Sequence, residues 1–281
     1  MAERSATATF NELSEVDASG STGEIYAELR RLTGVPVVAL IYRHIATHEG
    51  LLPHIWAALQ PILKSGVLQD AAAPIVEAMT PLNLIPPIDG NARRAISFEG
   101  ERMSATLNAI DSYNRANATN LLIMLSLLQR LKLLDDRVRP VPMRAWVPPA
   151  PISGPLSMMI SPTEMPNHIR RLINDLGFGD RSHLDPVVPS LFRHLCDAPG
   201  LLAISHVVLA PKFKDGTMAG AVAQLHASMV EQAERLAPYI APLPRLAATP
   251  AACSVMREFT AAWIPQMTII GFALRRSLTG T

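Results

Sequence analysis

Apolar residues recur along most of the chain at the three- and four-residue spacing of amphipathic helices. The first such run begins at Ile25 and ends at Gly34, and further runs follow it. The longest run, over residues 97–134, has a polar centre from Tyr113 to Asn120 between strongly apolar turns. Because no stretch shows a convincing set of alternating strands, the pattern predicts an all-α protein.

A proline-rich stretch divides this helical pattern in two. Eight prolines lie between Pro140 and Pro166, a composition typical of a linker rather than of a helix or strand. Helical spacing resumes at Thr163. The expected organisation is a polar N-terminal arm (1–21), a first helical unit (22–138), a linker (139–162) and a second helical unit (163–281).

Short matches relate the two helical units to each other. At an offset of 150 residues, the first unit's Arg43-His44 and Gly50-Leu51-Leu52 recur as Arg193-His194 and Gly200-Leu201-Leu202. Further along, Leu121 to Leu127 corresponds loosely to Thr268 to Leu274. The matches keep one order on either side of the linker, so we interpret them as an internal duplication. Two such units would pack as an intramolecular pseudo-dimer, with a cleft between them suited to a small molecule.

Composition supports a large helical core and argues against several classes of partner. Hydrophobic residues make up 49% of the 281 residues, and charged residues only 17%. The formal net charge is +1, so nothing supplies the phosphate neutralisation that nucleic-acid binding requires. The longest apolar runs fall short of the roughly 20 residues that span a membrane. We therefore expect a cytoplasmic protein with no nucleic-acid or membrane partner.

Cysteines and histidines form no recognisable metal or redox motif. Cys196 and Cys253 stand far apart within apolar helical segments, as buried inert thiols do. His44 and His48 have the i, i+4 spacing of a metal-binding pair but lack the HExxH arrangement. His44 and its repeat equivalent His194 could form an acid–base pair or could be scaffold positions on a helix surface. We expect neither a metal nor a cofactor.

Three segments together resemble the group I (D- and DL-) 2-haloacid dehalogenases. They are Gly34-Val35-Pro36 through His44-Ile45-Ala46-Thr47 and Gly50-Leu51-Leu52-Pro53; Ser112 to Asn117 with Leu121-Leu122; and Ser190, Phe192, Leu195 and Pro199 with Val208-Leu209-Ala210-Pro211. The similarity extends from about residue 20 to the C-terminus. It implies an all-α fold of two pseudo-symmetric repeats with the active site between them, and it is compatible with a homodimer.

The resemblance also implies a reaction. In this family an aspartate activates a water molecule, which attacks C2 of a small 2-substituted carboxylic acid and expels halide with inversion. An asparagine helps to hold that water, and Asn117 matches its position, although Asn117 could instead satisfy a polar kink in its helix. Leu191 stands where the aspartate is expected, between Ser190 and Phe192. Leucine cannot accept a proton, and losing a general base typically lowers the rate by about two to four orders of magnitude.

Two carboxylates could substitute for the missing base. Asp185 lies six residues before Leu191, but it equally fits the start of a turn before Pro186. Asp111 could approach from the asparagine-bearing helix, or it could be an exposed helix carboxylate.

Two function hypotheses therefore stand side by side. The first is a dehalogenase-like hydrolase with an altered base. The second is a non-catalytic relative that binds a small carboxylic acid or a small apolar ligand in the same cleft. The residues expected to line that cleft, besides Asn117, are Val37, Leu40, Asn114, Asn120, Ser190, Leu191 and Phe192.

Overall fold

The computed structural model describes residues 11–79, 83–142, 145–178, 187–243, 247 and 249–280, and every regular element in these ranges is a helix. The all-α fold predicted from the sequence is therefore confirmed. The helices before the linker are α1 (Gly20–Thr33), α2 (Leu40–Ile45), α3 (Leu51–Lys64), α4 (Val67–Met79), α5 (Gly90–Ala95) and α6 (Gly100–Arg130). Among the described residues, no helix is long and apolar enough to cross a lipid bilayer.

The elements after the linker are helical as well. They are η1 (Pro162–Glu164), α7 (Asn167–Ile173), η2 (Asn174–Phe178), α8 (Ser190–Leu195), α9 (Pro199–Lys214), α10 (Thr217–Leu236), η3 (Ala237–Tyr239), α11 (Pro250–Glu258), η5 (Phe259–Trp263) and α12 (Ile264–Thr279).

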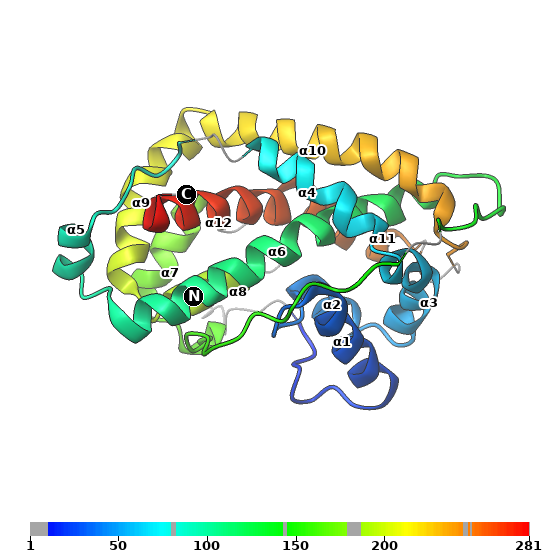
Figure 1. Cartoon of the computed structure of the whole chain (residues 1–281), viewed down its shortest axis with the longest axis horizontal. Helices are drawn as coiled ribbons and strands as arrows, with labels where there is room; N and C mark the ends of the chain where they lie inside the picture. Colours follow the sequence, from blue (N-terminus) through cyan, green and yellow to red (C-terminus); the bar gives the residue numbers. More distant parts are fainter. Residues whose placement is uncertain are drawn as a thin grey trace, which may run out of the picture.

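Helix α6 is the central element, and α10 and α12 pack along it (Figure 1). From Ala109 to Leu127 nearly every residue of α6 is buried, so the helix is covered on all sides. This burial explains why its sequence shows no single apolar face. Helix α12 packs tightly on α6 at Gly271, where an added methyl group would overlap Asn114 Oδ1.

The segment before α1 is docked against the helices. The backbone N–H of Leu13 donates to the Arg43 carbonyl at 2.9 Å, and the Tyr26 hydroxyl donates to the Leu13 carbonyl. Glu15 accepts a hydrogen bond from the Val38 N–H at 2.8 Å. The described part of the N-terminal arm is thus attached through both backbone and side chains, and α1 begins at Gly20, two residues before the expected boundary.

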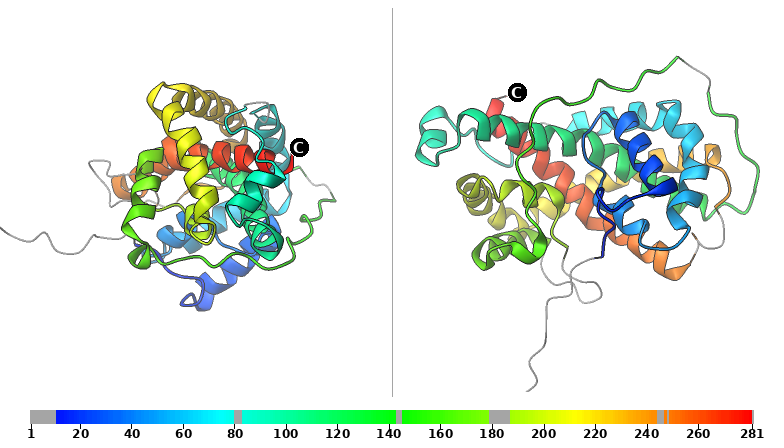
Figure 2. Two further views of the ribbon diagram at one scale, coloured as in Figure 1. Left: turned by 90° about the vertical axis from the view of Figure 1, so that its left-hand side faces the viewer. Right: turned by 90° about the horizontal axis from the view of Figure 1, so that it is seen from below.

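The linker between α6 and η1 is extended and packs on both ends of the molecule. It leaves α6 at one end and returns beneath it to α7 (Figures 1 and 2). Its Ile152 N–H donates to the Gly34 carbonyl at 2.9 Å, and its Arg139 N–H donates to Pro238 at 2.8 Å. The linker therefore contacts the end of α1 and η3, the short helix after α10, as well as connecting α6 to α7.

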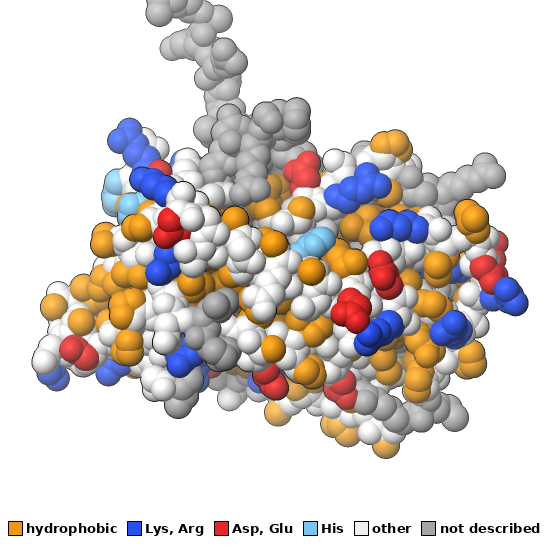
Figure 3. Space-filling model, turned by 90° about the horizontal axis from the view of Figure 1, so that it is seen from above, with side chains coloured by type: hydrophobic (Ala, Val, Ile, Leu, Met, Phe, Trp, Pro, Cys, Tyr) orange, Lys and Arg blue, Asp and Glu red, His pale blue; other side chains and the backbone are white. Residues whose placement is uncertain are grey.

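Charges of both signs are mixed over the face that includes α4 and α10. Figure 3 shows Lys and Arg side chains interspersed with Asp and Glu, with apolar side chains between them. This face carries no concentration of one sign.

Candidate functional site

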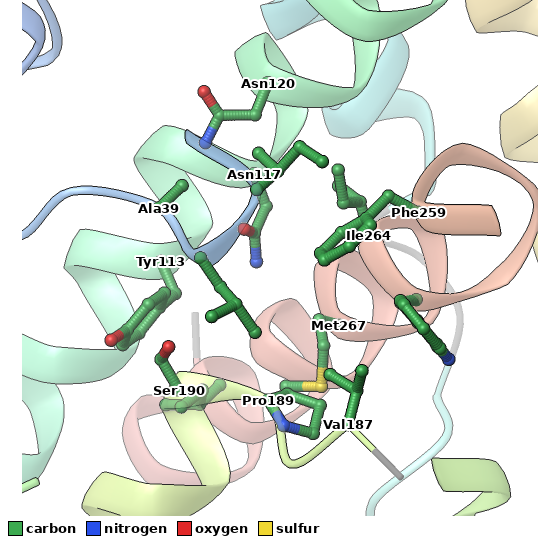
Figure 4. A pocket seen from close by; sticks show the side chains of 14 residues that line it. Ala39, Tyr113, Asn117, Asn120, Val187, Pro189, Ser190, Phe259, Ile264 and Met267 are labelled. Carbon is green, nitrogen blue, oxygen red and sulfur yellow. The ribbon is translucent and has the colours of Figure 1, made fainter. Parts of the chain in front are cut away.

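A small cavity lies where α2, α6, α8, η5 and α12 meet (Figure 4). Its volume is about 50 Å³, room for roughly three to five water molecules. The residues before the linker that line it are Ala39, Leu40, Ile41, Tyr113, Asn117 and Asn120. Those after the linker are Val187, Pro189, Ser190, Leu191, Phe259, Trp263, Ile264 and Met267.

Residues related by the two sequence offsets line this one cavity. At the offset of 150, Ala39, Leu40 and Ile41 correspond to Pro189, Ser190 and Leu191. At the offset of 147 between Leu121 and Thr268, Asn117 and Asn120 correspond to Ile264 and Met267. Each half of the chain thus contributes a helix start and a stretch of long helix to the same site.

Asn117 supplies a free polar group to the cavity. Its amide points into the space between the lining side chains, and no hydrogen bond joins it to another described residue (Figure 4). The side chain is only 9% exposed, so the amide depends on a molecule in the cavity for its hydrogen bonds. Asn120, by contrast, accepts a hydrogen bond from the Tyr42 hydroxyl at 3.1 Å.

The wall of the cavity includes Leu191, which is 1% exposed. Of the described residues that line the cavity, none carries a carboxyl group. Asp111 does not line the cavity; its carboxylate pairs with Arg275 at 2.6 Å. Asp185, the other candidate base, lies outside the described residues. The described lining can therefore position a small molecule but cannot remove a proton from water.

Two arginines lie behind the wall formed by Ser190 and Tyr113. Arg43 Nη2 donates to Ser190 Oγ at 2.9 Å. Arg43 and Arg193, which correspond at the offset of 150, both pair with Glu12, at 3.0 and 2.9 Å. One carboxylate thus pairs with an arginine from each half of the chain.

Tyr113 is part of the same polar cluster. Burial raises the pKa of Tyr113 to about 12. Three effects oppose part of that rise: the positive charge of Arg43, a hydrogen bond from Ser190 and the positive charge of Arg193. The hydroxyls of Tyr113 and Ser190 lie next to one another at one side of the cavity (Figure 4). The phenol therefore stays protonated at neutral pH, and the cavity faces mainly its ring.

Three expected lining residues do not line the cavity. Val37 is half-buried against the apolar core. Asn114 lines a second cavity beside α12, since its position on α6 faces Gly271 rather than α8. Phe192 is two residues beyond Ser190 and so points to the opposite side of α8; its ring packs edge-to-face on Phe178 with centroids 5.4 Å apart.

His44 and His194, which stand 150 positions apart in the sequence, lie in different surroundings. His44 Nδ1 lies 2.7 Å from the Asn11 carbonyl, and its ring contacts His48. His194 is buried, pairs with the Ser157 carbonyl and has its ring 5.8 Å from that of Tyr113. The contacts with Asn11 and His48 on one side, and with Ser157 and Tyr113 on the other, place the two rings in separate environments.

Sequence reasoning missed the wall contributed by the C-terminal helices. The chain passes from α11 to α12 through the π-helical turn η5, a feature often found at functional sites. Within it, Phe259 and Trp263 stack edge-to-face with centroids 4.8 Å apart, and both line the cavity. The sequence offset of 147, which matches Ile264 to Asn117, was the available signal that this region contributes to the site.

Comparisons with known proteins support one family. A configuration-inverting 2-haloacid dehalogenase from Alcaligenes xylosoxydans xylosoxydans is 28% identical over 218 residues, covering 73% of this chain and 70% of that protein. A crystal structure of a D-2-haloacid dehalogenase mutant has a TM-score of 0.72 at 15% identity, covering 99% of this chain and 97% of the other.

Two further solved structures contain small molecules. A mutant D-2-haloacid dehalogenase in complex with D-2-CPA has a TM-score of 0.71 at 14% identity, covering 96% of this chain and 95% of that one. A D-2-haloacid dehalogenase with L-LA has a TM-score of 0.70 at 14% identity, covering 99% and 98%. At these identities the solved structures show the fold. No family model matches the chain.

Proposed function

We propose that the chain is a member of the group I 2-haloacid dehalogenase family, which it resembles in sequence and fold, and that its cavity binds a small 2-substituted carboxylic acid. The observation that carries the proposal is the free amide of Asn117, buried and directed into the cavity. The small volume limits the ligand to a few non-hydrogen atoms. Apolar walls from Leu40, Leu191 and Trp263 would exclude water around it.

We also propose that the two halves of the chain are duplicated units forming a pseudo-dimer around this cavity. The shared lining positions and the arginine pair on Glu12 support that view. A cytoplasmic location and a homodimer remain predictions from composition and family resemblance.

Hydrolysis at C2 requires more than binding. A water held by Asn117 would have to lose its proton as it attacks, and a carboxylate within reach would be the acceptor. Position 191 is leucine, and the described lining offers no other carboxylate. We therefore propose that the wild-type chain binds the acid but releases halide very slowly or not at all.

Hydrolytic dehalogenation is the second candidate, and the same free amide of Asn117 favours it. It requires a base from outside the described lining. Asp185 is the residue to test, because it lies two positions before Val187, which lines the cavity.

Binding and chemistry can be tested separately with each enantiomer of 2-chloropropionate. Trp263 lines the cavity, so in a Trp56→Phe/Trp146→Phe background its fluorescence should report binding. We expect saturable binding of at least one enantiomer, weakened by Asn117→Ala. If neither enantiomer nor any small neutral analogue binds, the proposed function is wrong.

Halide release then decides between the two candidates. We expect Leu191→Asp to raise release by about two to four orders of magnitude over wild type. The matched control, Leu191→Asn, has nearly the same shape but accepts no proton and should stay inactive. Rapid release by wild type, abolished by Asp185→Asn, would instead establish the second candidate.

A further inference from the structure

We propose that the buried arginines behind the cavity wall, Arg43 and Arg193, make this site selective for an anionic ligand, with Glu12 setting the strength of that selectivity. The inference rests on the proposed function, because it concerns the charge of the small molecule that the cavity holds.

The cluster carries more positive than negative charge. Two guanidinium groups share the carboxylate of Glu12, at 3.0 and 2.9 Å, which leaves one net positive charge. The arginine side chains are only 4% and 8% exposed, so water screens them poorly. The neighbouring acid Glu15 is engaged elsewhere, with Arg30 and the Val38 N–H.

The cluster also has an unused donor. Arg43 Nε is buried and meets no acceptor among the described residues. An incompletely compensated buried cation is costly to hold in a folded protein. A negative charge nearby would lower that cost.

The cavity is the place where such a charge could sit. Arg43 donates to Ser190 Oγ, and Ser190 lines the cavity, so a single hydrogen-bonded hydroxyl separates the guanidinium from a ligand. Arg43 and Arg193 both act electrostatically on Tyr113, which lines the cavity too. The described lining has no charged side chain, so these arginines supply the field that attracts a carboxylate.

The test compares 2-chloropropionate with 2-chloropropionamide, an uncharged analogue of nearly the same shape. Isothermal titration calorimetry gives a dissociation constant for each, and the ratio of the two measures charge selectivity. We expect wild type to bind the acid more tightly than the amide. A change in packing alone would affect both ligands alike and leave the ratio unchanged.

Variants of the cluster should move this ratio in opposite directions. Arg43→Gln keeps a donor near Ser190 but removes the charge, and should lower the preference for the acid about tenfold. Glu12→Gln removes the negative charge and should raise the preference for the acid about tenfold. Arg43→Lys should keep the preference. The control, Arg275→Gln, disrupts the separate pair with Asp111 and should leave the ratio as in wild type.

The outcomes separate this inference from the function beneath it. Equal binding of acid and amide by wild type would overturn the charge selectivity and leave the cavity as a small-molecule site. Binding of neither ligand would remove the proposed function and the inference with it. Should Arg43→Gln fail to fold, Glu12→Gln carries the test, and an unchanged ratio in that variant overturns the inference.

Discussion

At the residue scale, the packing of α6 against α12 depends on a missing side chain. Gly271 lies against Asn114 Oδ1, a buried acceptor with no hydrogen-bond partner among the described residues. Glycine in a helix interior costs about 0.5–1 kcal/mol relative to alanine. The close packing of α6 and α12 that Gly271 allows offsets that cost.

Gly271→Ala should therefore destabilise the protein by about 1–3 kcal/mol, because the added methyl group overlaps the Asn114 side chain. Urea denaturation measures the change. The double variant Gly271→Ala/Asn114→Ala should be more stable than Gly271→Ala alone, since shortening Asn114 removes the overlap.

Gly220 provides a matched control for this substitution. It lies in α10, and a Cβ there would meet nothing within 4 Å. Gly220→Ala should be neutral or stabilising, by up to about 1 kcal/mol. Equal effects at positions 220 and 271 would show that helix propensity, and not the contact with Asn114, governs both.

At the scale of elements, α8 is fastened to α6 and the linker through a buried histidine. His194 contacts Tyr113 of α6 and pairs with the Ser157 carbonyl of the linker. Burial lowers the pKa of His194, and Arg193 and Arg43 lower it further, against the opposing effect of the Ser157 hydrogen bond. The folded structure therefore favours the neutral form of this ring.

This arrangement predicts acid sensitivity. Between the ordinary pKa of 6.5 and the lower folded value, the unfolded chain binds more protons at this position, so the free energy of unfolding falls as pH decreases below about 6.5. His194→Gln should flatten this part of the profile in denaturation measured from pH 7.5 to 5. His168→Gln, at an exposed position, should leave the slope unchanged.

The elements also show what the sequence could predict. Helical spacing and proline content sufficed for the fold class, for α6 and for the linker, because these depend on local pattern. The family resemblance placed Leu40, Ser190 and Leu191 in the expected site, and all three line the cavity. Phe259 and Trp263 escaped prediction because a π-helical turn changes which residues of a helix face inward, and spacing rules assume a regular α-helix.

At the scale of the whole molecule, Glu12 ties the two halves together. Its carboxylate pairs with Arg43 before the linker and Arg193 after it, and the linker binds both ends of the structure. Separating the halves would leave at least one buried arginine without its carboxylate, which is strongly unfavourable. Neither half should be stable alone.

Unfolding should accordingly be a single transition. Variants keeping only Trp56, in α3, or only Trp263, in η5, report on the first and second halves separately. Their fluorescence midpoints in urea should coincide with each other and with the loss of circular dichroism. Two separate midpoints would mean that the halves unfold independently and that the contacts of Glu12 do not couple them.

The position of Glu12 in the chain also matters during synthesis. Its partner Arg193 lies 181 residues further on, and a ribosome adding about 5–20 residues per second needs roughly ten to forty seconds to cover that distance. Until then Arg43 is the only one of the two arginines available to Glu12, and the cavity lacks the wall that Ser190 and Leu191 provide. The apolar surface of the nascent N-terminal half therefore stays exposed until the second half is synthesised. The protein would depend most on chaperones during this period.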